Sequence, residues 1–240
     1  LQFSWSFSGP GNISISDNTA PDPSLDFNGT EPGLYTITVE VGNEACDPIT
    51  QNFEVEVSAA PVVELAELDI YCEVASLDLL PSYPNQSLVD SVFWQFPAGA
   101  MPVEESNDLD PGNITVEGPG DYTVSVSVFN ACGESVAEQP FTILQGPMLD
   151  LAIPADTLCA GSSVMVENNS TGDQLAYTWT YEGNGNVTFS DATSPVPEAT
   201  FPDTGVFVLN VLVGNPVCDP VSWSDTVWVL ESPTVSFPAI

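Results

Sequence analysis

The sequence contains no lysine, arginine or histidine, although its 240 residues include 34 aspartates and glutamates. An ordinary soluble chain is about a quarter charged, with both signs present. Without basic side chains the protein forms no side-chain salt bridge and cannot neutralise phosphates, which excludes nucleic-acid binding. The absence of histidine excludes Ser-His-Asp catalysis and histidine-ligated zinc, and the absence of lysine excludes a P-loop.

Long apolar runs are also absent, because no stretch of 18 apolar residues occurs, so we expect no membrane-spanning helix. The chain is nevertheless 43% hydrophobic and 10% aromatic, which indicates a folded protein rather than a disordered one. Its 17 glycines and 22 prolines indicate many turns. The five cysteines include no Cys-x-x-Cys pair, which argues against a metal or redox motif.

Three segments that end in cysteine resemble one another: EPGLYTITVEVGNEAC, GPGDYTVSVSVFNAC and PDTGVFVLNVLVGNPVC. They end at Cys46, Cys132 and Cys218, at intervals of 86 residues, and Cys72 and Cys159 are 87 residues apart. This period predicts tandem repeats of about 86 residues. Either the chain is a fragment of a longer protein, or a neighbouring molecule completes its truncated first repeat. The predicted boundaries are 1–58 (the C-terminal part of a repeat), 59–144 and 145–231 (complete repeats) and 232–240 (the start of another).

The repeats also suggest how the cysteines pair. Each complete repeat holds two, so we predict the disulfides Cys72–Cys132 and Cys159–Cys218, with a partner for Cys46 upstream of Leu1. Each bond would close a loop of roughly 60 residues and contribute on the order of 4 kcal/mol in the chain-entropy model. The alternative is five buried free thiols.

The strand signals point to an all-β protein. Residues 35–41, 52–57 and 122–128 alternate apolar and polar side chains, and glycine- and proline-rich turns recur every 8–12 residues. This pattern predicts tandem antiparallel β-sandwiches. The Gly-x-Tyr segments at Tyr35 and Tyr122 resemble the tyrosine corner of immunoglobulin-like domains, and Phe207 lacks the hydroxyl that this corner uses.

A tryptophan strand precedes each Gly-x-Tyr/Phe strand, at Trp5, Trp94 and Trp179. Together these motifs resemble the polycystic-kidney-disease (PKD) domain in all three repeats, although SFSGPG, QFPAGA and TYEGNG stand where that family has an acidic turn. The sequence most resembles the cysteine-bearing PKD-like arrays in giant surface proteins of gliding Gram-negative bacteria. This resemblance implies tandem Ig-like, PKD-like sandwiches, secretion to the cell surface, and a stalk or adhesin role.

Carboxylates are the only candidates for acid–base work or cation binding. They do not recur at equivalent motif positions, so we expect solvated faces and no enzyme activity. Oxygen-rich loops can bind Ca²⁺, and the acidic loop before the second Gly-x-Tyr strand is the candidate site; the alternative is diffuse cation condensation with no required cofactor. The candidate ligands are Glu104, Glu105, Asp108 and Asp110.

Two further groups of residues are candidate contact or modification sites. We expect the three repeated tryptophans to be core residues rather than sugar platforms, and Trp223 and Trp228 to face opposite sides of one strand, so that one of them could be exposed. Three Asp-Ser/Thr-aliphatic segments resemble the O-glycosylation pattern of gliding bacteria, with acceptors at Ser91, Thr157 and Thr226.

The sequence therefore predicts a structural repeat array that forms an extracellular stalk or filament of a bacterial surface adhesin. Its partners would be neighbouring repeats or copies of itself. The alternative is a binding module that recognises glycan or protein, with Ca²⁺ as a candidate cofactor. A third hypothesis is polymerisation, with one molecule supplying strands to the next.

Overall fold

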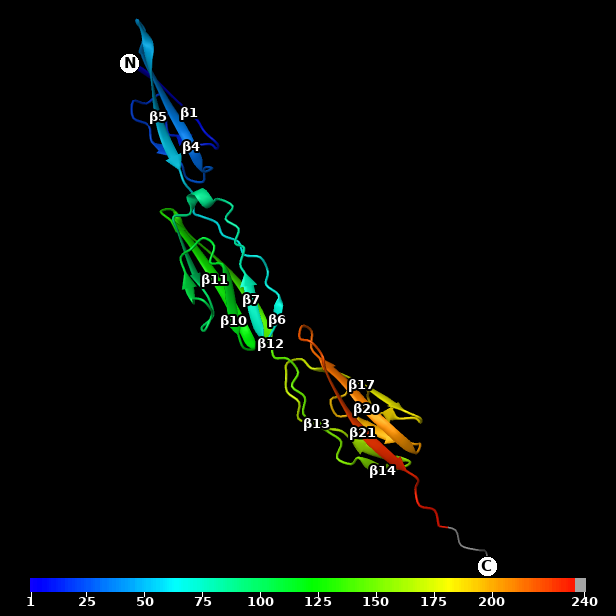
Figure 1. Ribbon diagram of the computed structural model, residues 1–240. Helices are drawn as coiled ribbons and strands as arrows, with labels where there is room; N and C mark the ends of the chain where they lie inside the picture. The colour runs from blue at the N-terminus through cyan, green and yellow to red at the C-terminus, as the bar shows by residue number, and fades with distance from the viewer. Residues whose placement is uncertain (236–240) are drawn as a thin grey trace, which may run out of the picture.

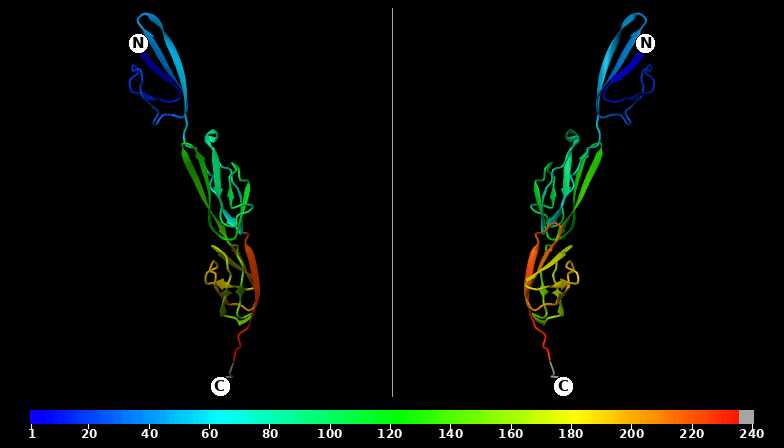
Figure 2. Two further views of the ribbon diagram at one scale, coloured as in Figure 1. Left: turned by 90° about the vertical axis from the view of Figure 1, so that its left-hand side faces the viewer. Right: turned by 90° about the vertical axis from the view of Figure 1, so that its right-hand side faces the viewer.

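The computed structural model describes residues 1–235 and contains three β-rich units that lie end to end (Figure 1). We call them the first unit (residues 1–58), the second unit (59–144) and the third unit (145–231). Figure 2 shows the same elongated shape from two sides, with the first and third units at opposite ends. Within residues 1–235 no helix has the length and apolar character needed to span a bilayer.

The second unit is a sandwich closed around Trp94, which is fully buried with Leu77 and Ile114 in one core. Its strand order is β10-β7-β6-β12-β11-β8-β9. A single residue pair connects β6 to β7, so that β7 and β10 face β8 and β11 across the core. The elements are β6 (Ile70–Cys72), β7 (Val74–Asp78), the 3₁₀ helix η1 (Gln86–Leu88), β8 (Ser91–Gln95), β9 (Glu105–Ser106), β10 (Asn113–Glu117), β11 (Gly120–Asn130) and β12 (Gly133–Leu144).

The third unit repeats this plan with its two layers as separate sheets, ordered β14-β21-β20-β17 and β15-β19-β18, plus the pair β13-β16. Phe201 and Phe207 are fully buried in one core cluster, and Trp179 is buried in a second. The strands are β13 (Leu151–Ala152), β14 (Thr157–Cys159), β15 (Ser162–Met165), β16 (Glu167–Asn168), β17 (Ala176–Gly183), β18 (Thr188–Phe189), β19 (Glu198–Phe201), β20 (Gly205–Gly214) and β21 (Val221–Leu230).

The first unit has the three long strands in the order β1-β4-β5, with the short pair β2-β3 beside them. Within residues 1–58 no strand stands at the counterpart of β6, so the outer edge of β5 has no partner strand there. Ile49 and Phe53 on β5 are exposed and Trp5 is only partly buried, because no strand within residues 1–58 stands at the counterpart of β7 to cover this face of the sheet. The strands are β1 (Gln2–Ser8), β2 (Ser14–Ile15), β3 (Leu25–Asp26), β4 (Gly33–Asn43) and β5 (Cys46–Val57).

The alternation in the sequence explains the layers. In the middle of β11 every second residue, Val124, Val126 and Val128, is fully buried, because successive side chains of a strand point to opposite faces. No polar or charged side chain is buried within residues 1–235, so the carboxylates lie outside the cores. The prediction of tandem antiparallel β-sandwiches is confirmed, and the structure adds two parallel pairs, β6 with β12 and β14 with β21.

Two sequence motifs fix the loops onto these cores. The hydroxyl of Tyr35 donates to Glu31 O at 2.7 Å and that of Tyr122 to Gly118 O at 3.0 Å, which confirms the tyrosine corner in the first two units. Each repeated tryptophan donates its indole N–H to a loop carbonyl 14 or 15 residues later. Trp94 and Trp179 are core residues as predicted, whereas Trp5 is half-buried because the layer that would cover it is incomplete.

Candidate functional site: a disulfide between two units

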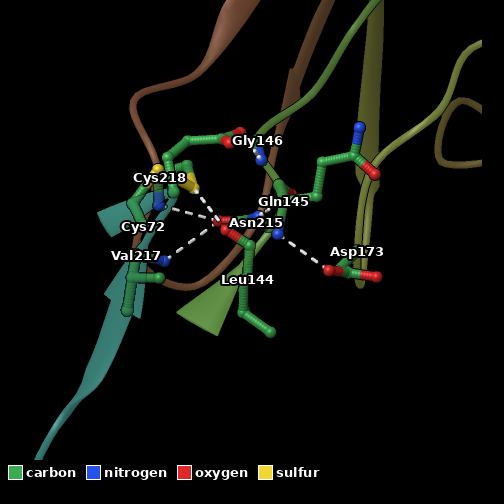
Figure 3. Close-up of a disulfide and its surroundings, with 9 residues drawn as sticks. Cys72, Leu144, Gln145, Gly146, Asp173, Asn215, Val217 and Cys218 are labelled. Carbon is green, nitrogen blue, oxygen red and sulfur yellow. Dashed lines mark hydrogen bonds between the residues drawn. A yellow bond between two sulfur atoms is a disulfide. The ribbon is translucent and has the colours of Figure 1, made fainter. Parts of the chain in front are cut away.

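The second and third units are joined by a disulfide between Cys72 and Cys218, whose Cα atoms are 5.1 Å apart (Figure 3). Cys72 ends β6 and lies beside Leu144, the last residue of β12, in a parallel register. Cys218 lies in the loop between β20 and β21 of the next unit and is buried. The bond therefore connects the end of one sandwich to the beginning of the next, close to the linker that already joins them.

The predicted disulfides Cys72–Cys132 and Cys159–Cys218 are wrong. Cys72 pairs with Leu144 at the end of β12, whereas Cys132 precedes the start of that strand. Eleven residues of extended chain separate the two ends, which corresponds to about 36 Å. A disulfide needs Cα atoms roughly 4.4–6.8 Å apart, so the two cysteines of one repeat cannot meet. The same geometry along β21 separates Cys159 from Cys218.

The linker at this junction consists of Gln145 and Gly146, the first residues of the third unit, and side chains from both units hold it. From the third unit, Asn215 Nδ2 donates to Gln145 O at 3.0 Å, and Asp173 Oδ2 accepts the N–H of Gln145 at 2.7 Å. From the second unit, Glu73 Oε1 accepts the N–H of Gly146 at 2.6 Å. Figure 3 shows these contacts converging beside the two sulfur atoms. The linker is therefore fixed on both sides.

Asn215 also shapes the loop that carries Cys218. Its Oδ1 accepts the N–H groups of Val217 at 3.1 Å and Cys218 at 2.7 Å. Asn130 makes the equivalent bond to Cys132 at 2.8 Å, and Asn43 the equivalent bond to Cys46 at 2.9 Å. Each unit thus presents one cysteine on the hairpin between its last two long strands, and an asparagine closes this hairpin, which we call the asparagine-capped hairpin.

The three remaining cysteines, Cys46, Cys132 and Cys159, are exposed and unpaired within residues 1–235. The alternative of buried free thiols does not describe them. The predicted partner of Cys46 upstream of Leu1 lies outside the described residues. Sequence spacing could not distinguish bonding within a repeat from bonding to the next, because both cysteines recur with the same period. The fact that decides the pairing is the parallel direction of the first and last strands of a repeat, which places its two cysteines at opposite ends of the unit.

The four residues of the predicted Ca²⁺ site are exposed, and three of them serve the loop itself. Glu104 Oε1 accepts the N–H of Gly99 at 2.6 Å, and Asp110 Oδ1 accepts that of Gly112 at 2.9 Å. Asp108 contributes its backbone carbonyl to the Trp94 indole, and Glu105 lies on β9. In the described part of the chain no group of three or more acidic or cysteine side chains is arranged to hold a metal ion, and Ca²⁺ binding at this loop stays a prediction.

Tyr83 lies beside this loop and donates its hydroxyl to Leu109 O at 2.8 Å. Partial burial, and secondly the negative charge of Asp110, raise the pKa of Tyr83 above its ordinary value of 10. The hydroxyl therefore keeps its proton, and its bond to Leu109 O, to a higher pH than an exposed tyrosine would.

The other candidate residues are distributed over the surface. Ser91 and Thr157 are exposed at the starts of β8 and β14, and Thr226 is half-buried in β21. Trp223 packs edge-on against Trp179, whereas Trp228 is 45% exposed on the opposite face, as the odd spacing predicted. Trp228 pairs with Val206, which is also exposed, so an apolar pair lies on the outer face of the third unit.

No protein-family description matches the chain, and no curated protein sequence matches it. Solved structures of tandem domains are similar in outline. Domains 3–5 of the Drosophila OTK extracellular region have a TM-score of 0.45 and 12% identity, covering 97% of this chain and 85% of that one. Sidekick-1 immunoglobulin domains 1–4 have a TM-score of 0.46 and 13% identity, covering 97% of this chain and 68% of that one. Titin domains I67–I69 from the I-band have a TM-score of 0.43 and 14% identity, covering 96% of this chain and 88% of that one. Since likenesses this weak carry no functional information, the role of this chain follows from its own residues.

Proposed function

We propose that this chain is a structural repeat array, part of an extracellular stalk or filament of a bacterial surface adhesin. The observation that carries the proposal is the bond between Cys72 and Cys218, because it joins two consecutive units rather than stabilising either one alone. A second covalent connection beside a short linker resists the separation of two domains under load. That is a property required of a stalk.

The bond also changes how tension passes along the chain. Once the folded units yield, force applied to the two ends passes from Cys72 through the disulfide to Cys218 and leaves along β21, so the backbone of residues 73–217 cannot be stretched out. At roughly 3.4 Å per extended residue, the stretched oxidised chain would measure about 320 Å and the reduced chain about 800 Å. The strands between Cys72 and Cys218, from β7 to β20, are therefore protected from being extended while the bond is intact.

The composition suits exposure outside the cell. Disulfides persist in oxidising compartments, which supports secretion. The formal charge of −34 is carried by side chains outside the cores, so neighbouring rods repel one another and remain soluble. Trypsin-like proteases, which cleave after lysine or arginine, find no site in the sequence.

Antibody labelling of intact, unpermeabilised source cells, followed by electron microscopy, tests the location and form of the assembly. We expect label on extended fibres outside the cell envelope. Label that appears only after permeabilisation, or only on compact particles, would contradict the proposal. Single-molecule stretching of the oxidised chain tests the mechanical part, with Cys132→Ser as a matched control that retains the bond and Cys72→Ser as the variant that loses it.

The exposed pair of Trp228 and Val206 favours a second candidate function, a binding surface for glycan or protein. Exposed aromatic rings stack on sugars and on apolar protein surfaces. A glycan array probed with the chain, with Trp228→Ala and with EDTA tests it. Binding that is lost in Trp228→Ala would support this function, and loss with EDTA would add a requirement for Ca²⁺. An array without any signal would remove the glycan form of the hypothesis.

A further inference from the structure

We propose that the bond between Cys72 and Cys218 is one member of a series. The end of the third unit around Cys159 is a docking site for the asparagine-capped hairpin of another repeat of this kind, and Cys159 forms a disulfide with that hairpin's cysteine. Each unit in an array would then be bonded to the unit before it and to the unit after it. The inference goes beyond the proposed stalk role and does not depend on where the protein is displayed.

The end of the unit that carries the first cysteine is built in the same way in the second and third units. Cys72 stands opposite Leu144 in a parallel register, and Cys159 stands opposite Leu230 in the same register. The following residue then closes each turn, since Glu73 N donates to Leu144 O at 2.9 Å and Ala160 N to Leu230 O at 2.8 Å. Cys159 therefore occupies, at the end of the third unit, the place that Cys72 occupies in the observed junction.

The chain that leaves each unit also follows the same course past this cysteine. Gly146 is bonded through its N–H to the carboxylate of Glu73, the residue after Cys72. Its counterpart Ser232 donates its hydroxyl to the carbonyl of Ala160, the residue after Cys159, at 3.2 Å. The start of the next linker is thus tied to the end of the third unit, where it would present a following unit to Cys159.

The contact between the asparagine-capped hairpin and the linker before its unit recurs as well. At the observed junction Asn215 binds the linker carbonyl of Gln145, and at the preceding junction Asn130 binds the carbonyl of Ala59, the equivalent linker residue, at 2.7 Å. Cys132 is therefore delivered to the end of the first unit as Cys218 is delivered to the end of the second. Within residues 1–58 no strand stands at the counterpart of β6, and the Cys132 thiol is exposed.

Cys159 thus corresponds to Cys72, and Cys132 corresponds to Cys218, in the junction where the two cysteines are bonded. Bond formation requires a disulfide oxidant. One protein thiolate attacks the oxidant disulfide and releases one thiol; the second protein thiolate displaces the other thiol, leaving one protein disulfide and two reduced thiols. Because Cys159 lies inside the loop closed by Cys72 and Cys218, the loops closed by successive bonds would overlap along the sequence.

A protein in which residues 1–230 are followed directly by a second copy of residues 145–231 tests this inference. Thr157→Ser and Asp219→Glu in the added copy mark its peptides by mass. After refolding with oxidised glutathione, Asp- or Glu-specific digestion without reduction identifies the bonded pairs. We expect Cys159 bonded to the added hairpin cysteine, Cys72 still bonded to Cys218, and three free thiols, as in the parent chain.

Two results would overturn the inference while Cys72 and Cys218 remain bonded as an internal control for folding. One is five free thiols, with Cys159 unbonded. The other is a bond between two cysteines of the same repeat. In the matched variant with serine for the added hairpin cysteine, we expect four free thiols and an unbonded Cys159. A bond from Cys159 to any other cysteine in that variant would show that the docking site does not select the hairpin.

Discussion

Asn215 of the third unit donates its side-chain amide to the backbone carbonyl of Gln145, which lies in the linker leaving the second unit. The same side chain accepts two N–H groups of its own loop, one of them from Cys218. One residue thus sets the shape of the hairpin and its position against the neighbouring unit. Asn130 and Ala59 repeat this relationship one junction earlier.

Two substitutions of Asn215 should separate the stability that its bond to the linker contributes from the stability that its bonds within the hairpin contribute. Asn215→Ala removes the amide and its three hydrogen bonds, and at about 1 kcal/mol for each bond we expect a loss of about 3 kcal/mol in the free energy of unfolding of the third unit. Asn215→Asp keeps the acceptor for the hairpin but cannot donate to Gln145, so it should cost less. Urea unfolding of both variants checks this order, and equal losses would contradict it.

Loss of the disulfide should destabilise the chain strongly. The bond closes a loop of 146 residues, which the chain-entropy model converts to about 5 kcal/mol. We expect Cys72→Ser and Cys218→Ser to lower the melting temperature of the second and third units in oxidising buffer, and to match the reduced native chain. Cys132→Ser is the control, because its thiol is unpaired within the described residues. Calorimetry with and without reductant decides the matter, and a native chain that melts equally in both would refute it.

The tyrosine corner of the first unit should contribute measurably to stability. The hydroxyl of Tyr35 donates to Glu31 O and accepts the N–H of Gly11 at 2.8 Å, and Tyr35 is fully buried. Tyr35→Phe leaves these groups without a partner, so we expect a loss of roughly 1–3 kcal/mol confined to the first unit. Tyr181→Phe in the third unit serves as a control. Hydrogen exchange of the Gly11 amide should increase in Tyr35→Phe alone, and unchanged exchange would speak against the bond.

Asp191 should give a small stability contribution with a defined pH window. The backbone N–H of Thr193, first, and its hydroxyl donate to Asp191 Oδ1 at 2.8 and 2.7 Å, and they lower the pKa of this carboxyl below 3.8. A carboxyl whose pKa is depressed by folding stabilises the protein above the unfolded pKa, and the effect is lost as the pH falls through the folded pKa. We expect the stability difference between the native chain and Asp191→Asn to shrink between about pH 5 and pH 2. Urea unfolding across this range tests it, and a pH-independent difference would exclude it.

Salt should stabilise the protein through screening. With 34 carboxylates and no basic side chain, raising the ionic strength from about 10 mM to about 500 mM shortens the screening length and should raise the melting temperature. At fixed ionic strength we expect the same midpoint with Na⁺ and with Ca²⁺. A Ca²⁺-specific increase that disappears in Asp110→Asn would instead place a cation at the acidic loop.

The sequence by itself determined the all-β class, the period of the units and the interior positions of their strands. These are local properties, since alternation along β11 or β20 specifies which residues are buried whatever lies beyond the sandwich. It also determined the tyrosine corner, whose hydroxyl at Tyr35 or Tyr122 reaches a carbonyl only four residues earlier. The lack of basic residues excludes whole classes of chemistry on composition alone, because no fold can supply a side chain that the sequence does not contain.

Only the tertiary structure decided which cysteines meet. The parallel pairing of β14 with β21 and of β6 with β12 puts the two cysteines of one repeat at opposite ends of a strand. End-to-end stacking then brings Cys72 to Cys218 in the next unit. Folding also dispersed the acidic loop, because Glu104 and Asp110 bond to nearby backbone N–H groups instead of converging. A periodic sequence repeats both ends of every unit identically, so it cannot specify which copies touch; the direction of the strands and the stacking of the units do.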